Sequence, residues 1–430
     1  MRTFITSLLF ASFFAATAQN DMYFPPVGSD DWETVTPEEI GWCSTGLDTL
    51  SNFLEDRNTN AFILLHQGRI VVEEYFNDFH EDSVWVWNSA GKTITATMAG
   101  IAQEERLLTL DDATNTYLGE GWTNLTLEQE SAITIWNQLT MTSGLDDTEV
   151  DVFCTDPECL TYLEPPGDRW AYHNGPYTLL QDVIGEAAGS TMNLYTYQQL
   201  LQPTGMTGLF LPIGYNKIFV SKPRSMARFG LLMQNKGIWD GTPVLDDANF
   251  FQEMVNPTQD LNESYGYLWW LNGYDSYQLP GIQLEIPGSM VPSAPDDMFA
   301  ALGADSQVIH VVPSMDLVLI RMGSSPDNSL LPVTFNVELW EVLDFLFCDF
   351  PDSVEEEQTN DVSVYPNPSS TNFEIKGAST TSSWTLFNQL GTQVLSGTGR
   401  IVPVNQLAGG AYFLVVQDGE ALSRHQVVVL

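Results

Sequence analysis

The chain has 430 residues, of which 43% are hydrophobic, so it is long enough to bury a large core in two or three domains. Acidic residues outnumber basic ones by 56 to 15, and the formal net charge of -41 disfavours binding to nucleic acid or to an anionic membrane face. The acids are spread along the chain, which is typical of a solvated surface.

The N-terminus has the pattern of a cleaved export signal. Met1-Arg2 precedes an apolar stretch over residues 4–15, and Ala16-Thr17-Ala18 supplies the small residues that a signal peptidase recognises. Residues 1–18 are therefore predicted to be a signal peptide, and no other segment is apolar for long enough to span a bilayer. We expect an exported protein, in which its four cysteines can form disulfides.

Residues 19–350 are predicted to form one domain with strands near both of its ends. The predicted elements are, in chain order, a helix that begins at Ser44 as its N-cap, a hairpin over 62–72, a hairpin over 308–320 and an apolar helix over 333–347. This order favours an α+β fold, in which an antiparallel sheet is assembled from both ends of the domain and helices lie between.

A linker and a second domain are predicted after residue 350. Residues 351–360 have almost no apolar content and include three consecutive acids, which is typical of a linker. Residues 361–430 alternate short strand-like runs with Gly, Ser and Asn turns, which predicts a small all-β sandwich. The expected strands are 373–375, 384–387, 401–404, 411–416 and 426–430.

Ser89 and Lys92 form a Ser-x-x-Lys pattern within an apolar region. On the first turn of a helix this spacing puts both side chains on one face, where hydroxyl and amine can share a proton. The lysine can act as a base only if its pKa is lowered, and the apolar residues on both sides of the motif favour the burial that lowers it. A surface lysine after a serine N-cap is the alternative. No other lysine of the chain has a serine three positions before it.

A serine nucleophile needs a second group that protonates the leaving group. The tripeptide Tyr-x-Asn occurs three times, beginning at Tyr75, Tyr172 and Tyr365, so the pattern alone is weak. The second copy, which ends at Asn174, follows a Pro-Pro-Gly loop and precedes a helical run. This context favours Tyr172 as the proton donor, and a core tyrosine is the alternative.

Five motifs follow one another in the order of a known family. They are Ser89-Ala90-Gly91-Lys92, the segment 139–145, Tyr172-His173-Asn174-Gly175, the segment 227–230 and the segment 265–270. Together they resemble the signatures of serine beta-lactamase-related hydrolases, which include class C beta-lactamases, D-alanyl-D-alanine peptidases, family VIII carboxylesterases and 6-aminohexanoate-dimer hydrolases. The likeness extends over roughly residues 35–350 and implies a beta-lactamase-like fold, with a helical domain against an antiparallel sheet flanked by helices.

The resemblance also implies a role for each residue of the site. Ser89 forms an acyl-enzyme, Lys92 and Tyr172 transfer protons, and Asn174 hydrogen-bonds within the site. The backbone amides of Ser89 and Ala304 are implied as the oxyanion hole. No metal or cofactor is required by this chemistry.

One element of the family is altered here. The strand that lines the cleft carries Lys-Thr-Gly or His-x-Gly in relatives, and the matching stretch is Ala301-Leu302-Gly303, which keeps the glycine and lacks the basic residue. Anionic substrates are therefore expected to do poorly. Four tryptophans near the motifs are candidates for apolar walls of the site or for core packing: Trp87, Trp170, Trp269 and Trp270.

The C-terminal domain has its own look-alike. The segments 364–368, 386–391 and 407–413 resemble the type IX secretion sorting domain of Bacteroidetes. This resemblance implies export through the periplasm, contact with the type IX secretion machinery, and a secreted or cell-surface protein. The Tyr-x-Asn that begins at Tyr365 is then a turn between prolines.

The cysteines fall into two predicted pairs. Cys154 and Cys159 bracket a short turn-like spacer that a local disulfide could close. In the resembled fold the first and last helices of the domain pack antiparallel, which implies a second disulfide between Cys43 and Cys348.

The sequence thus predicts a secreted serine hydrolase that acts on carboxylic esters or unactivated amides. A D,D-peptidase or beta-lactamase is one alternative, and a catalytically silent surface protein that binds a ligand is another. Neither the Gly-x-Ser-x-Gly elbow of α/β-hydrolases nor the His-Glu-x-x-His of zincins occurs in the chain.

Overall fold

The computed structural model describes residues 22–148, 151–326, 332–348, 362–387, 393–418 and 421–429. The predicted signal peptide (1–18) and the predicted linker (351–360) lie outside these ranges. The chain divides into two compact units, one up to residue 349 and one from residue 350.

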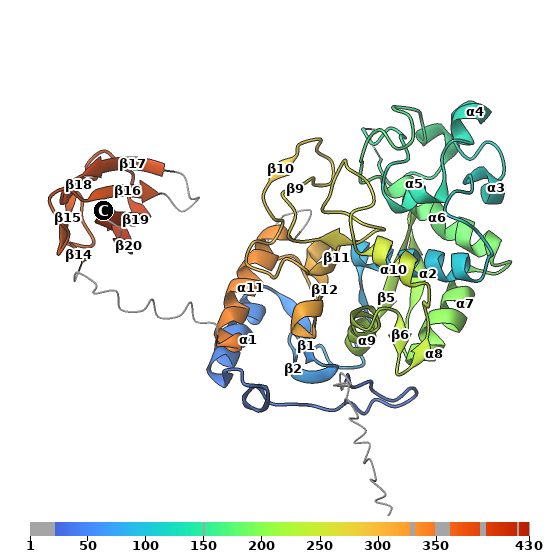
Figure 1. Ribbon diagram of the computed structural model, residues 1–430, viewed down its shortest axis with the longest axis horizontal. Coiled ribbons are helices and arrows are strands. Elements are labelled where there is room, and N and C mark those ends of the chain that lie inside the picture. Colours follow the sequence, from blue (N-terminus) through green and yellow to red (C-terminus); the bar gives the residue numbers. More distant parts are fainter. Residues whose placement is uncertain are drawn as a thin grey trace, which may run out of the picture. The chain divides into compact units, whose positions relative to one another are not determined.

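The first unit is built on a six-stranded antiparallel sheet. Its strand order is β2-β1-β13-β12-β11-β8, so strands from the start of the unit pair with strands from its end (Figure 1). The register places Ile63 of β1 opposite Ile320 of β13. All residues of β12 and β13 are buried, because both faces of the sheet are covered, and such strands need continuous apolar runs. The predicted sheet from both ends of the domain is confirmed.

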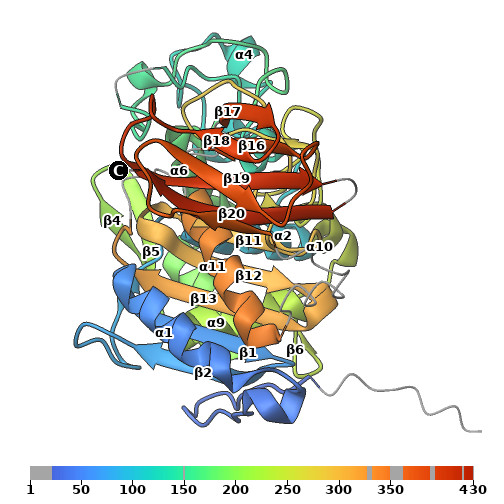
Figure 2. The same cartoon turned by 90° about the vertical axis from the view of Figure 1, so that its left-hand side faces the viewer.

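Helices cover the two faces of this sheet. Helices α1 and α11 pack against each other on one face, and α9 packs against β12 and β13 on the other (Figure 2). The helices of the unit are α1 (Leu47–Asp56), α2 (Lys92–Glu104), α3 (Asn115–Leu118), α4 (Leu127–Glu130), α5 (Ile135–Leu139), α6 (Asn174–Ala187), α7 (Met192–Thr196), α8 (Gln202–Thr204), α9 (Pro223–Gln234), α10 (Ala248–Met254) and α11 (Val333–Phe347).

Shorter sheets complete the first unit. Strands β3, β5 and β4 form a three-stranded sheet that contacts α6 and α7, and β6–β7 and β9–β10 form two-stranded ones. The strands are β1 (Thr59–His66), β2 (Arg69–Tyr75), β3 (Trp85–Val86), β4 (Leu209–Ile213), β5 (Asn216–Ser221), β6 (Ile238–Trp239), β7 (Thr242–Pro243), β8 (Trp270–Leu271), β9 (Ser276–Tyr277), β10 (Ile286–Pro287), β11 (Phe299–Gly303), β12 (Gln307–Val312) and β13 (Leu317–Gly323).

A disulfide joins the two ends of the first unit. Cys43 and Cys348 are bonded, the pairing that the resemblance implies. Ser44, however, is not the N-cap of the first α-helix, because residues 44–46 form a 3-10 turn and α1 begins at Leu47. Gly46 explains the tight entry, since a Cβ on it would lie 2.6 Å from the backbone of Phe345 in α11. The chain therefore passes directly against α11 before α1 starts.

The second unit consists of two antiparallel sheets around a small apolar core. Its sheets have the orders β14-β15-β18 and β17-β16-β19-β20, and the core includes Phe373, Trp384 and Leu414. The five expected strands are confirmed up to residue 429, and β14 and β17 were not predicted. The strands are β14 (Ser363–Tyr365), β15 (Asn372–Lys376), β16 (Ser383–Phe387), β17 (Gln393–Thr398), β18 (Ile401–Pro403), β19 (Gly410–Asp418) and β20 (Ala421–Val429).

None of the helices in the described part of the chain is long and apolar enough to cross a membrane.

Candidate active site

Ser89 and Lys92 meet where the chain enters α2. Ser89 lies in a 3-10 turn, η3 (Asn88–Gly91), and Lys92 is the first residue of α2. The Lys92 Nζ donates a hydrogen bond to Ser89 Oγ at 3.2 Å and another to Asn174 Oδ1 at 2.8 Å. One helical turn therefore puts hydroxyl and amine in contact, as the Ser-x-x-Lys spacing predicts.

Burial prepares Lys92 to act as a base. Its side chain is 5% exposed, and the loss of solvent lowers the pKa of its amine to about 7, because water stabilises the charged form. The rings of Tyr177 and Tyr172 lie 4.3 Å and 5.1 Å from Nζ, where their faces stabilise a positive charge once it forms. A large fraction of Lys92 is thus neutral near pH 7, and the ammonium that it forms by accepting a proton is stabilised.

Tyr172 reaches Ser89 from a second segment. Its hydroxyl hydrogen-bonds Ser89, and burial raises the pKa of the phenol well above its usual value. The ring stacks on Trp270 with centroids 5.8 Å apart, Tyr265 meets it edge to face, and Trp170 lies tilted against it. Tyr172 is therefore a protonated phenol at neutral pH, held in place by an aromatic cluster.

Asn174 completes the polar group around the serine. It is the first residue of α6 and is 7% exposed, and its side-chain oxygen accepts the Lys92 hydrogen bond. His173, between Tyr172 and Asn174, is buried, and desolvation lowers its pKa to about 4, so it is neutral at pH 7. The site around Lys92 thus contains uncharged polar partners only, among the residues described.

The end of β11 lies against the nucleophile turn. A Cβ on Gly303 would lie 2.4 Å from the Trp87 carbonyl oxygen and 3.1 Å from the Ser89 amide nitrogen, so only glycine permits this approach. Asn88 Nδ2 donates to the Ala304 carbonyl oxygen at 2.9 Å, which connects η3 to the residue after β11. The backbones of Ser89 and Ala304, the predicted oxyanion donors, are thereby held beside the same space.

Two cavities open onto Ser89, and they share Ser89, Phe153, Asn174 and Ala304. The larger, which we call the Tyr172 cavity, has a volume of about 260 Å³. It is lined by Ser89, Asp147, Val152, Phe153, Tyr172, Asn174, Pro280, Gly281, Leu302 and Ala304. The smaller, the Lys217 cavity, has a volume of about 140 Å³. It is lined by Asn88, Ser89, Gly91, Lys92, Phe153, Asn174, Tyr177, Asn216, Lys217, Ile218, Phe219 and Ala304.

Apart from Lys92, each of the two cavities has one charged side chain in its lining, and that side chain forms an ion pair. Asp147 in the Tyr172 cavity forms an ion pair with Arg169 at 2.5 Å. Lys217 in the Lys217 cavity forms an ion pair with Asp182. A third cavity of about 370 Å³, which includes Lys236 and Asp297 in its lining, contains none of the predicted catalytic residues. The predicted catalytic residues therefore lie at the two smaller cavities.

The four candidate tryptophans are core residues and not walls of the site. Each is at most 2% exposed, and none lines either cavity. Trp87, for example, donates its indole hydrogen to Ser221 Oγ at 2.8 Å. The apolar wall of the Tyr172 cavity comes instead from Val152, Phe153, Pro280 and Leu302. Ala301, the neighbour of Leu302, is fully buried and does not line this cavity.

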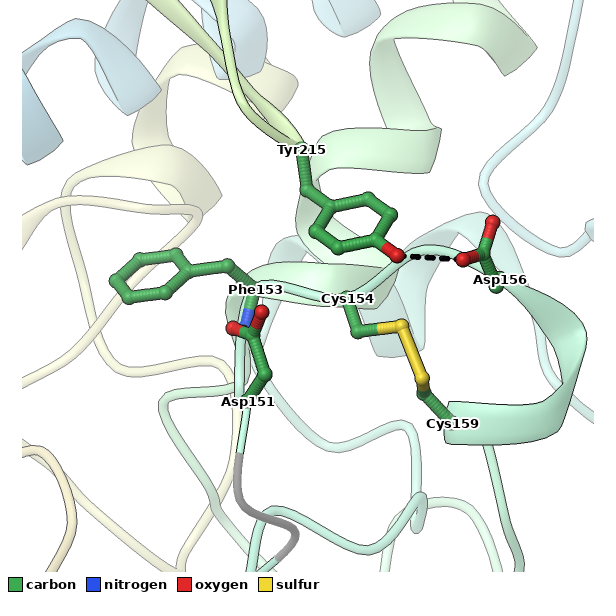
Figure 3. The surroundings of a disulfide bond; sticks show 6 residues. All are labelled: Asp151, Phe153, Cys154, Asp156, Cys159 and Tyr215. Atoms are coloured by element: carbon green, nitrogen blue, oxygen red, sulfur yellow. Dashed lines mark hydrogen bonds between the residues drawn. A yellow bond between two sulfur atoms is a disulfide. The ribbon is translucent and has the colours of Figure 1, made fainter.

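The second disulfide lies beside the site. Cys154 and Cys159 are bonded, as their spacing predicts, and the preceding residue, Phe153, lines both cavities (Figure 3). Sequence reasoning missed Phe153, Lys217 and Tyr177 as lining residues. Only Tyr177 carried a signal, because it is three residues after Asn174 on the same helix and so faces the same way.

In the ranges that the structure describes, no group of three or more His, Cys, Asp or Glu side chains could hold a metal ion.

The first unit matches a known family model over most of its length. Residues 48–330 match the family described as Beta-lactamase, and residues 363–430 match a model described as Secretion system C-terminal sorting domain. Modules of the second kind direct export by type IX secretion to the cell surface or the extracellular space. No curated protein sequence matches the chain significantly.

Solved structures share the fold at low sequence identity. A protein assigned as a 6-aminohexanoate-dimer hydrolase from Bacillus anthracis is 18% identical, with a TM-score of 0.56 over 73% of this chain and 87% of its own. One assigned as a beta-lactamase from Bacteroides dorei is 15% identical, with a TM-score of 0.56 over 71% and 99%. A penicillin-binding protein homologue from Caulobacter crescentus is also 15% identical, with a TM-score of 0.54 over 70% and 98%. The expected beta-lactamase-like fold is confirmed.

Proposed function

Because this chain belongs to the beta-lactamase family of serine hydrolases, we propose that it is a secreted enzyme that cleaves neutral carboxylic esters or unactivated amides through an acyl-enzyme on Ser89. The observation that carries the proposal is the contact between Ser89 Oγ and a buried Lys92 whose pKa is lowered to about 7. A neutral amine at hydrogen-bond distance is what a serine hydroxyl needs in order to lose its proton during attack.

In the acylation step, Ser89 Oγ attacks the carbonyl carbon while its proton passes to Lys92 Nζ. The carbonyl oxygen takes up the negative charge and accepts hydrogen bonds from the amides of Ser89 and Ala304. The bond to the leaving group then breaks, and the leaving oxygen or nitrogen takes the phenolic proton of Tyr172, which Lys92 replaces with its own. The high pKa of Tyr172 supports this role, because the phenol carries its proton at neutral pH.

Deacylation runs by the same groups in reverse. Water attacks the acyl carbon and gives a proton to Lys92, and Ser89 Oγ takes a proton back as the carboxylic acid leaves. Asn174 supports both steps by accepting a hydrogen bond from Lys92 Nζ, which orients the amine toward Ser89.

The charges of the site support a neutral substrate. Of the cationic side chains that line the two cavities, Lys217 is paired with Asp182 and Lys92 is buried. Arg169 does not line either cavity, and it is paired with Asp147, which lines the Tyr172 cavity. In the part of the chain that is described, no unpaired surface cation remains there to bind a substrate carboxylate, and the net charge of -41 repels anions.

The test is labelling of the purified protein with a fluorophosphonate and with a fluorescent penicillin, followed by peptide mapping. We expect the fluorophosphonate on Ser89, hydrolysis of nitrophenyl acetate, little turnover of nitrocefin, and loss of both labelling and turnover in Ser89→Ala with unchanged thermal unfolding. Labelling by penicillin with efficient nitrocefin hydrolysis would indicate a D,D-peptidase or beta-lactamase instead. Labelling by neither reagent would indicate a ligand-binding protein without activity.

A further inference from the structure

Phe153 is one of the residues that the two cavities at Ser89 share. It lines both the Tyr172 cavity and the Lys217 cavity, as do Ser89, Asn174 and Ala304. Phe153 is the bulkiest of these four side chains, and it is 41% exposed, so its ring is not part of the core. Both cavities therefore border the same apolar ring beside Ser89.

The loop that follows Phe153 is fixed by two contacts. Cys154, 3% exposed, is bonded to Cys159, and the Tyr215 hydroxyl donates to Asp156 within the closed loop at 2.5 Å (Figure 3). The picture shows the Phe153 ring directed away from the disulfide.

The same loop is attached to the first turn of α6. The Gly175 amide donates to the Val152 carbonyl oxygen at 3.0 Å. A Cβ on Gly175 would lie 2.4 Å from the Cys154 carbonyl oxygen, so the two backbones are in direct contact. Because Gly175 follows Asn174, which accepts a hydrogen bond from Lys92, the position of Phe153 is coupled to that of Asn174.

The chemistry of the proposed reaction assigns the two cavities. The leaving group must lie within reach of the Tyr172 hydroxyl, and Tyr172 lines only the larger cavity. The acyl group then points the other way from the carbonyl carbon, into the Lys217 cavity, where Ile218, Phe219 and Tyr177 supply apolar surface.

We propose that Phe153, held in place by the Cys154–Cys159 disulfide, is a specificity-determining residue that separates the acyl subsite from the leaving-group subsite and restricts the enzyme to short acyl groups. The proposal rests on the proposed function. The acyl subsite, with a volume of about 140 Å³, is the smaller of the two cavities and suits a short acyl chain. The Tyr172 cavity, at about 260 Å³, accepts larger alcohols or amines.

The experiment measures kcat/KM along two ester series in the full-length protein. One series varies the acyl chain of nitrophenyl esters from acetate to octanoate, and the other varies the alcohol of acetate esters. For the wild type we expect a steep fall beyond butyrate in the first series and a shallow dependence in the second. Phe153→Ala should raise the octanoate-to-acetate ratio by at least about tenfold, because it joins the two cavities.

Controls separate the ring from its support. Phe153→Tyr keeps the bulk and should keep the wild-type ratio, and so should Tyr162→Ala, which removes another exposed aromatic residue of the same segment that lines neither cavity. The double variant Cys154→Ser/Cys159→Ser should shift the ratio in the same direction as Phe153→Ala and by less, because the ring remains but its loop is released.

The outcomes distinguish the two proposals. An octanoate-to-acetate ratio that is the same in Phe153→Ala and in the wild type, with Ser89 labelled by fluorophosphonate in both, would overturn the role of Phe153 and leave the proposed function intact. A wild type whose Ser89 is not labelled and that cleaves no ester overturns the proposed function, and the role of Phe153 with it.

Discussion

Two lysines line the same cavity in opposite surroundings. Lys92 is 5% exposed, its hydrogen-bond partners are the uncharged Ser89 and Asn174, and its pKa is lowered to about 7. The Lys217 side chain is 32% exposed and is ion-paired with Asp182. In a chain with 56 acidic residues, a carboxylate is at hand for the outer lysine, and none pairs with the inner one among the described residues. The lowered pKa of Lys92, on which its proposed role as a base rests, therefore depends on the exclusion of acids as much as on burial, since a carboxylate partner would keep the amine protonated.

The largest expected effect comes from removing each lysine in turn. Lys92→Met should lower kcat/KM for a short-chain nitrophenyl ester by about 10²- to 10⁴-fold, because the base is lost. Lys217→Met should lower it by less than about tenfold, since a partly exposed ion pair contributes little. Steady-state kinetics of both variants check the contrast. Equal losses of kcat/KM would mean that Lys92 matters as a lining residue of the cavity and not as the base that accepts the proton.

A second contrast uses the repeated Tyr-x-Asn tripeptide. Tyr172→Phe should lower kcat/KM by about 10²-fold or more, because the phenolic proton for the leaving group is removed. Tyr75→Phe loses a hydrogen bond to Glu73 at 2.5 Å, at the end of β2, and should leave kcat/KM within about twofold at the cost of roughly 1 kcal/mol in stability. Full activity in Tyr172→Phe would remove Tyr172 from the mechanism.

The third comparison concerns the pH dependence of stability. The pKa of Lys92 is about 7 in the folded protein and near its ordinary value of 10.5 when the chain is unfolded. Between these values the unfolded state binds the extra proton, so the contribution of Lys92 to the free energy of unfolding rises with pH across this window, by up to about 1.4 kcal/mol per unit. Lys92→Met should therefore be more stable than the wild type near pH 7, and this advantage should shrink toward pH 10.

The measurement is urea unfolding of both proteins at several pH values, followed by helical circular dichroism. All described helices lie in the first unit, so this signal reports the unit that contains Lys92. An advantage of Lys92→Met that stays constant between pH 7 and 10 would contradict a lowered pKa.

Local patterns predicted much of this structure. The Ser-x-x-Lys pair needs only one helical turn to bring its groups together, and the hairpin over 62–72 needs only a turn and two apolar runs. Tyr172 could be chosen from three copies of its tripeptide because the loop before it and the helix after it are also local features.

The two cavities are also built from distant segments, and much of their lining was not predicted. The Lys217 cavity joins Phe153 to Lys217 and Ala304, which lie on three segments far apart in the sequence. The spacing of Cys154 and Cys159 indicated a closed loop, but nothing local indicates what such a loop faces. The four tryptophans near the motifs illustrate the same limit. Proximity in sequence does not determine whether a side chain faces the cavity or the core.

The Cys43–Cys348 disulfide also has a mechanical consequence. When the protein is held N-terminal to residue 43 and pulled through residue 348, the side on which the sorting module follows, the tension passes through the sulfur atoms. The intervening chain, with a sequence separation of 305, lies outside this load path, so α11 is not peeled from the sheet. Without the bond, pulling out the same segment would lengthen the molecule by on the order of 1,000 Å. Ser89 and both of its cavities lie within the segment that the disulfide closes. Under such a pull on the C-terminal module, this segment carries no load.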